Sequence, residues 1–214
     1  MRFSDPAVAA VHADYERRRT EEMARQAAMG GAMLARRDEF LLPVGPEVGA
    51  FLHSLILARR PARILELGTS YGYSTLFLAD AARQVGGILI TMDLADYKQA
   101  EARTQIERAG LGGVVDFRLG DAVALIDADP GPFDFVLLDI WKDLYVLCLE
   151  AFHPKLSDEA IVAADNMIEP DIARPDARAY RAAVRALSDM QSALLPIGSG
   201  IELSVKWRAA SSKL

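Results

Sequence analysis

Short apolar segments alternate with helical segments through most of the chain. The apolar segments are 63–67, 87–92, 114–119, 133–138 and 160–164. The helical segments that follow them are 73–82, 97–109, 122–126, 144–152 and 178–190. Strands that alternate with helices form parallel sheets, and continuous apolar strands indicate that helices cover both faces of the sheet. The alternation therefore predicts an α/β fold built on a mostly parallel sheet.

The two ends of the chain depart from this alternation. Near the C-terminus, apolar segments at 193–196 and 201–207 flank a glycine-containing turn, which predicts an antiparallel pair of strands and brings the sheet to seven strands. Near the N-terminus, residues 5–29 and 46–60 have the patterns of two helices that precede the first strand. A chain of 214 residues fits a single domain of this kind.

Polar residues follow the predicted strands at their carboxyl ends, where open α/β sheets bind their ligands. The composition narrows the chemistry expected there. One cysteine and three separated histidines argue against a metal site rich in either residue, and the single cysteine favours a reducing, cytoplasmic location. A net charge of −6 makes a nucleic-acid partner unlikely. No apolar stretch is long enough to span a membrane, so no membrane association is expected.

A glycine-bearing loop from Gly68 to Gly72 follows the first strand and opens a helix. Its spacing is G-x-x-x-G, whereas dinucleotide-binding proteins have G-x-G-x-x-G, so a nucleoside without phosphates is favoured over NAD. Glu66 lies in the apolar strand before this loop, where an unpartnered charge is costly. Asp93 ends the second strand and can accept hydrogen bonds from ribose hydroxyls. The segment 120–122 is either an adenine contact or a simple helix N-cap.

Three oxygen-bearing side chains follow the fourth and fifth strands. Asp139 comes directly after the fourth strand, and Asp165 and Asn166 come after the fifth. Because neighbouring parallel strands end at the same edge, we expect these side chains to lie together. A ligand set of oxygens favours Mg²⁺ or Ca²⁺ over zinc. Lys142 lies three residues after Asp139, and a lysine near a bound cation can serve as a general base. The structural alternative is that both aspartates merely end strands and that Lys142 is a solvated residue at a helix start.

Together these motifs resemble those of the metal-dependent S-adenosylmethionine O-methyltransferases. The similar segments are 66–74 (ELGTSYGYS), 91–93 (TMD), 138–145 (LDIWKDLY) and 164–166 (ADN). In catechol O-methyltransferases the third segment reads L-D-H-W-K-D-R-Y, whereas the caffeoyl-CoA branch has D-A-D-K. The resemblance extends from about Leu42 to Lys206. It implies a Rossmann-like, S-adenosylmethionine-binding core over 61–214, preceded by N-terminal helices (1–60) that form a cap, a lid or a dimer contact.

Position by position, the resemblance implies a role for each matching residue. The cofactor S-adenosylmethionine would be contacted by Val44, Glu66, Gly68, Thr69, Ser74, Asp93, Ala122, Asp139 and Trp141. The ligands of Mg²⁺, or of another divalent cation, would be Asp139, Asp165 and Asn166, and Lys142 would be the catalytic base. Glu202, Trp141 and Pro170 would border the substrate.

The resemblance implies a cytoplasmic, homodimeric enzyme that moves a methyl group from S-adenosylmethionine to a hydroxyl of a catechol-like small molecule. The chain departs from the catechol pattern at two places. Ile140 replaces a histidine, and residues 120–123 read G-D-A-V where the catechol enzymes have G-A-S-Q. Three alternatives stay open: methylation of hydroxylated uridine in tRNA, methylation of a caffeoyl-CoA-type ester, and nucleoside binding without catalysis.

Overall fold

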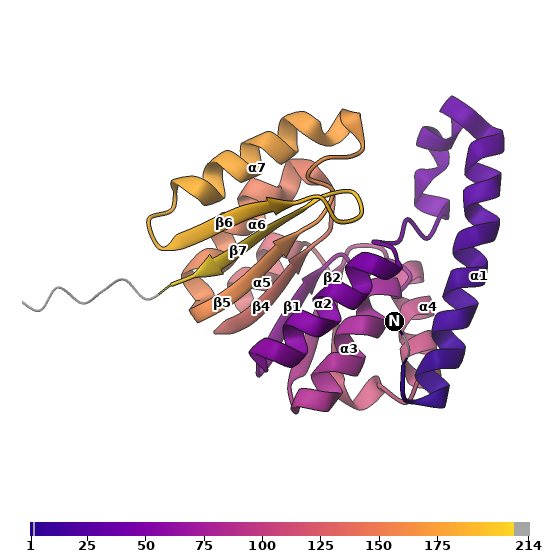
Figure 1. Cartoon of the computed structure of the whole chain (residues 1–214), viewed down its shortest axis with the longest axis horizontal. Coiled ribbons are helices and arrows are strands. Elements are labelled where there is room, and N and C mark those ends of the chain that lie inside the picture. The colour runs from indigo at the N-terminus through magenta and orange to yellow at the C-terminus, as the bar shows by residue number, and fades with distance from the viewer. Residues whose placement is uncertain (2, 208–214) are drawn as a thin grey trace, which may run out of the picture.

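The computed structural model describes Met1 and residues 3–207. Within these residues one seven-stranded sheet has the order β3-β2-β1-β4-β5-β7-β6 (Figure 1). The strands are β1 (Arg63–Leu67), β2 (Ile88–Asp93), β3 (Val115–Leu119), β4 (Phe133–Leu138), β5 (Leu156–Ala164), β6 (Met190–Leu195) and β7 (Ile201–Lys206). The first five are parallel, and β7 pairs antiparallel with both β5 and β6. The predicted fold class is confirmed.

Helices cover both faces of this sheet, as the continuous apolar strands predict. The helices are α1 (Pro6–Met29), α2 (Pro46–Arg59), α3 (Tyr73–Val85), α4 (Asp96–Arg108), α5 (Ala122–Ala128), α6 (Tyr145–Phe152) and α7 (Arg174–Ala186). Short 3-10 helices are η1 (Gly30–Glu39), η2 (Gly112–Val114), η3 (Lys142–Leu144), η4 (His153–Lys155) and η5 (Asp171–Ala173). None of the helices in the described part of the chain is both long and apolar enough to cross a membrane.

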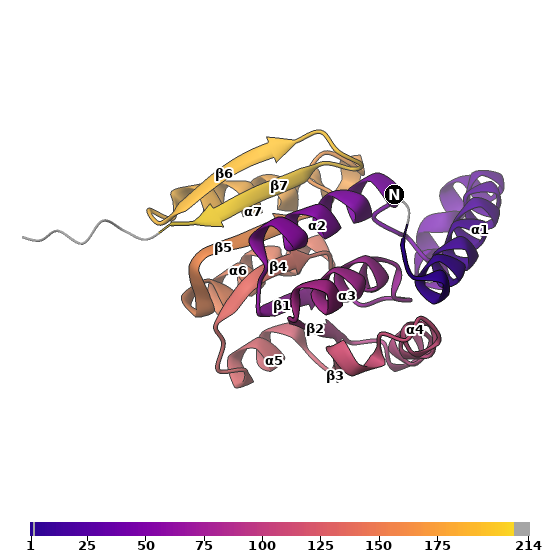
Figure 2. The same ribbon diagram turned by 60° about the horizontal axis from the view of Figure 1, so that its bottom comes forward.

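The core is divided by the sheet into two layers, because successive strand residues point to opposite faces. Ile64 of β1 packs with residues of α1 to α4, whereas Leu65 packs with residues of α5 to α7. Figure 2 shows α1 outside the main layers, beside α3 and α4. The N-terminal helix is thus part of the same packed unit as the sheet.

The last βα unit differs from its predicted bounds. The helix expected over 178–190 runs instead from Arg174 to Ala186, and Met190 begins β6, where it pairs with Lys206. The strand expected over 193–196 accordingly begins earlier. Residues 208–214, which were assigned to the methyltransferase core, lie outside the described residues.

The chain changes direction across the sheet at β1, which lies between β2 and β4. Such a switch point leaves a crevice at the carboxyl ends of the central strands. The register places Leu138 beside both Leu67 and Ala164, so β1, β4 and β5 end side by side. The loops that begin at Gly68, Asp139 and Asp165 therefore meet at one edge.

Candidate active site

The loop after β1 needs glycine at its first position. Gly68 has φ +104°, and a Cβ there would overlap the carbonyl oxygen of Asp139. The backbone N–H groups of Gly68 and Thr69 both donate to the Met92 carbonyl, at 2.9 and 3.2 Å. This close packing joins the glycine loop to the ends of β2 and β4, and it is possible because glycine has no side chain.

Glu66 is fully buried near the end of β1, and within the described residues only hydroxyl groups donate to its carboxylate. Ser74 donates to Oε1 at 2.6 Å, and Thr75 and Thr91 donate to Oε2 at 2.7 Å each. Thr69 lies 2.6 Å from the Thr91 hydroxyl and extends the network. Burial raises the pKa of Glu66 to about 7, although the three hydrogen bonds lower it. The chain thus places an ionisable group, without a cation partner, where the cofactor is expected.

Asp93 organises the two loops that follow β1 and β2. Its Oδ2 accepts from the Ser70 N–H at 2.7 Å, and its Oδ1 accepts from the Ala95 N–H at 2.8 Å. The neighbouring Asp121 caps α5 by accepting from the Ala124 N–H at 2.9 Å. The N-cap interpretation of segment 120–122 is therefore observed, and Ala122 is the first residue of that helix.

Asp139 and Asp165 follow neighbouring strands, as predicted. Their N–H groups donate to Leu67 and Leu138 at 2.9 and 3.1 Å, which extends the sheet pairing to these two residues. The Asp165 side chain is buried, and its Oδ1 accepts from the Asn166 N–H at 2.7 Å. Burial, together with the nearby charge of Asp139, raises the pKa of Asp165 above its ordinary value.

These groups fit a hard divalent cation. The charge of Asp139 lies close enough to disfavour the ionised form of Asp165, and a cation bound between the two carboxylates would relieve that repulsion. No group of three His, Cys, Asp or Glu side chains suited to a metal occurs in the described residues. A cation bound here would need the amide oxygen of Asn166 as a third ligand, and oxygen ligands of this kind match Mg²⁺.

Lys142 begins η3 beside these carboxylates. Its Nζ donates to Asp139 Oδ1 at 3.2 Å, to the Ile140 carbonyl at 2.9 Å and to the Tyr145 hydroxyl at 2.7 Å. An ammonium group has three N–H donors, and each has an acceptor here. The structure thus brings Lys142 to Asp139, whereas a solvated lysine would point away.

The residues expected to border the substrate lie in different surroundings. Trp141 is 47% exposed, and the Arg37 guanidinium of η1 lies 4.2 Å from the centre of its ring. Pro170 precedes η5. Glu202 on β7 is fully buried, and it accepts from Arg185 and Arg181 of α7 at 2.7 and 3.1 Å. Its carboxylate is therefore already engaged by two cations.

A pocket of about 290 Å³ connects the N-terminal segment with the candidate metal site. Its lining residues are Arg19, Glu22, Met23, Gln26, Leu42, Pro43, Gly45, Asn166 and Ser199. Val44 lies within the same loop, between two of the lining residues. This arrangement brings α1 to the edge of the candidate site.

Two parts of the site were missed in the sequence. The hydroxyls of Thr75 and Thr91 hold Glu66, and the Tyr145 hydroxyl holds Lys142. Thr91 carried a signal, because it is the polar residue inside an otherwise apolar strand. Tyr145 is the last residue of the segment 138–145 (LDIWKDLY) that matches the family motif, but the motif alone gave no reason to connect its hydroxyl with Lys142.

Comparison with known proteins agrees with this geometry. The family model described as O-methyltransferase matches residues 32–207. A catechol O-methyltransferase of Niastella koreensis is 34% identical over 131 residues, which cover 59% of this chain and 59% of that protein. Caffeoyl-CoA O-methyltransferase 2 of Zea mays is 32% identical over 184 residues, 76% of this chain and 69% of that protein.

The O-methyltransferase from Bacillus cereus, solved in complex with SAH, has a similar fold, with a TM-score of 0.73 and 23% sequence identity. The match covers 95% of this chain and 92% of the Bacillus cereus chain. For three curated relatives, the Niastella enzyme among them, the match spans only 52% to 64% of their own length. The family model nevertheless matches nearly all of the described chain from η1 onward, and the protein belongs to the O-methyltransferase family.

Proposed function

We propose that this protein transfers a methyl group from S-adenosylmethionine to a hydroxyl of a catechol-like small molecule, with the help of Mg²⁺ or another divalent cation. One observation carries the proposal: Asp139, Asp165, Asn166 and Lys142 converge at the ends of β4 and β5, against the glycine loop. A nucleoside-binding module without catalysis has no use for a lysine held beside two carboxylates. The combination favours an enzyme.

The donor would lie across the ends of β1 and β2. The glycine loop follows β1 there, and Ser74, which donates to the buried Glu66, lies in the first turn of the helix that the loop opens. Asp93 is expected to bind the ribose hydroxyls. Val44, Thr69 and Ala122 complete the expected contacts, and Asp139 and Trp141 approach from the loop after β4. The Bacillus cereus relative was solved with SAH, which supports a donor of this class.

The acceptor would lie between this donor site and α1. A cation held by Asp139, Asp165 and Asn166 would act as a Lewis acid that lowers the pKa of a coordinated hydroxyl. Lys142 would take the hydroxyl proton at Nζ, for which it must first give up one of its own protons. The oxygen then forms a bond to the methyl carbon as the carbon–sulfur bond breaks, and the sulfonium becomes a neutral thioether. Trp141 and Pro170 are the proposed substrate contacts, whereas the buried Glu202 is already paired with Arg181 and Arg185.

A homodimer through residues 5–40 and a cytoplasmic location stay predictions. So does the acceptor's identity, because the match to the Zea mays enzyme keeps caffeoyl-CoA-type esters as a second candidate. Methylation of hydroxylated tRNA is disfavoured by the net charge of −6.

A methyl-transfer screen tests the proposal. Catechols, caffeoyl esters and hydroxylated tRNA are each incubated with the protein and labelled S-adenosylmethionine, with Mg²⁺ or with a chelator. We expect transfer to catechols only with Mg²⁺. The Lys142→Ala variant should have a kcat at least about 10²-fold lower. Activity that survives complete chelation, or an undiminished rate in Lys142→Ala, would contradict the mechanism.

A further inference from the structure

The Tyr145 hydroxyl lies between Lys142 and the ends of two strands. It is 2.7 Å from Lys142 Nζ, 2.8 Å from the Leu138 carbonyl oxygen and 3.3 Å from the Asp165 carbonyl oxygen. These three neighbours belong to η3, to the last residue of β4 and to the first residue after β5. One hydroxyl thus links the lysine to the two strands that carry the carboxylates.

The directions of these hydrogen bonds follow from the chemistry of the groups. Carbonyl oxygens only accept, so the single hydroxyl proton of Tyr145 must point to Leu138, with Asp165 as a weaker second acceptor. The phenolic oxygen therefore turns its lone pairs toward Lys142 and accepts from the ammonium. Reversal would leave a buried backbone carbonyl without this donor.

Tyr145 is a rigid anchor for this contact. Its side chain is fully buried, and its ring packs edge-on against that of Tyr180 with centres 5.5 Å apart. The other two acceptors of Lys142, Asp139 and Ile140, lie on the same short loop as the lysine itself. Among the described contacts, Tyr145 is thus the one that ties this long, flexible side chain to the helix layer under the sheet.

We propose that Tyr145 is a positioning residue for Lys142: its hydroxyl holds the amine at the edge of the site where the acceptor is to be deprotonated. The proposal rests on the proposed function for its catalytic consequence. The positioning itself is a property of the protein without ligands. A displaced amine would lose the alignment on which proton transfer depends.

Tyr180 is a matched control. It is also fully buried, it shares the same ring contact, and its hydroxyl has no hydrogen-bond partner within the described residues. Replacement by phenylalanine removes one buried hydroxyl in either case. Only at Tyr145 does the change remove a contact with Lys142.

The first readout needs neither metal nor cofactor. In protein labelled with ¹³C-lysine, the Lys142 side-chain signal is assigned by its absence in Lys142→Met, and its order parameter is measured. We expect a rigid Lys142 in the wild type and in Tyr180→Phe, and a mobile Lys142 in Tyr145→Phe. A mobile Lys142 in the wild type would overturn the proposal even if the Tyr145 variant failed to fold.

The second readout is kinetic. Tyr145→Phe should lower kcat by about 10- to 100-fold, with KM for S-adenosylmethionine within about twofold of the wild type and a similar melting temperature, whereas Tyr180→Phe should keep its kcat. An unchanged kcat, or unchanged Lys142 dynamics, in folded Tyr145→Phe would overturn the proposal. A wild type that methylates no acceptor would instead refute the proposed function, and the dynamics alone would then decide the role of Tyr145.

Discussion

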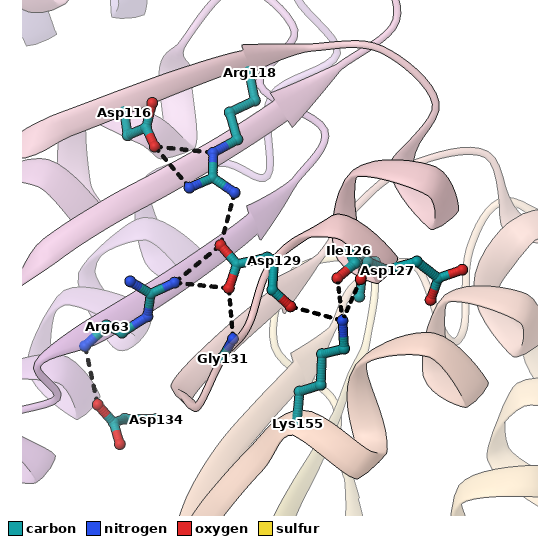
Figure 3. Close-up of polar contacts among 9 residues, drawn as sticks. All are labelled: Arg63, Asp116, Arg118, Ile126, Asp127, Asp129, Gly131, Asp134 and Lys155. Carbon is teal, nitrogen blue, oxygen red and sulfur yellow. Dashed lines mark hydrogen bonds and ion pairs between the residues drawn. The ribbon is translucent and has the colours of Figure 1, made fainter.

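Buried carboxylates in two regions of this protein have different kinds of partner. Asp129 lies near the start of β4, and Arg63 and Arg118 bind it from β1 and β3 (Figure 3). Glu66 and Asp165 lie at the other ends of the strands, where hydroxyl and backbone donors are their main partners. The contrast separates charges that stabilise the fold from charges that are left for a ligand.

Asp129 forms a cluster with Arg63, Arg118 and Lys155, here called the Asp129 cluster, and each of these three side chains binds it. Arg63 donates to both carboxylate oxygens at 2.8 and 2.9 Å, Arg118 donates at 2.7 Å, and the Lys155 ammonium binds the Asp129 carbonyl at 2.7 Å. Burial raises the pKa of Asp129, but the Gly131 N–H and the two arginines outweigh it, so that the pKa is lowered. The Asp129 carboxylate thus already has its cation partners.

At the carboxyl ends of β1 and β5, the effect of burial on the pKa outweighs the interactions that lower it. Burial raises the pKa of both Glu66 and Asp165. The nearby Lys142 lowers the pKa of Asp165, but by less than burial raises it. A buried carboxylate with a raised pKa destabilises the folded protein when it is ionised. Such groups are common at functional sites, where a bound ligand can supply the missing cation or hydrogen-bond donor. The buried carboxylate of Asp129 is therefore paired with two cations, whereas burial dominates at Glu66 and Asp165.

The largest effect on stability is expected from Asp129→Asn. The variant leaves Arg63 and Arg118 without their shared carboxylate, and breaking a buried ion pair in this way should lower the free energy of unfolding by about 3 kcal/mol. Urea unfolding measures this loss. At a temperature where the variant is folded, its kcat should stay within about twofold of the wild type. A lower kcat with an unchanged free energy of unfolding would contradict the structural role of Asp129.

A smaller effect, opposite in sign, is expected from Glu66→Gln. The folded pKa of about 7 lies above the ordinary 4.5, so wild-type Glu66 contributes stability that is fully present below pH 4.5 and is lost as the pH rises to 7. Glutamine mimics the protonated form. The ligand-free variant should therefore be more stable than the wild type at pH 8 by about 1–2 kcal/mol, since the shift limits the effect to about 3 kcal/mol.

Urea unfolding of both proteins between pH 5 and 8 measures the Glu66 effect. The difference in unfolding free energy between variant and wild type should grow over this range, whereas S-adenosylmethionine should bind the variant more weakly. A difference that is independent of pH would show that burial does not shift this group.

The sequence predicted the strands and the placement of the carboxylates well, for a physical reason. A run of apolar residues indicates a buried parallel strand, and the polar residue after that run marks where the strand ends, as at Asp139 and Asp165. The α7 region was less predictable. The run from Arg178 to Met190 has helical composition, yet the pairing of Met190 with Lys206 in the sheet takes precedence over local preference.

Side-chain partners were the least predictable part. Position alone placed Lys142 near Asp139, but its contact with the Tyr145 hydroxyl depends on the turn that η3 makes into α6, which the sequence analysis did not predict. Glu202 shows the same limit. Its place in the sequence motif indicated a substrate contact, whereas its two arginine partners come from α7, about twenty residues earlier in the chain.

The central claim is that the carboxylates at the ends of β4 and β5 bind a divalent cation. Calorimetric titration of the protein with MgCl₂ at pH 8 tests it most directly, with Asp165→Asn as the variant and Asp129→Asn as the control. We predict one Mg²⁺ site in the wild type and in Asp129→Asn, and an affinity at least about tenfold weaker in Asp165→Asn, because the buried charge has been removed. Equal Mg²⁺ affinities in wild type and Asp165→Asn, or no binding to the wild type, would contradict the claim.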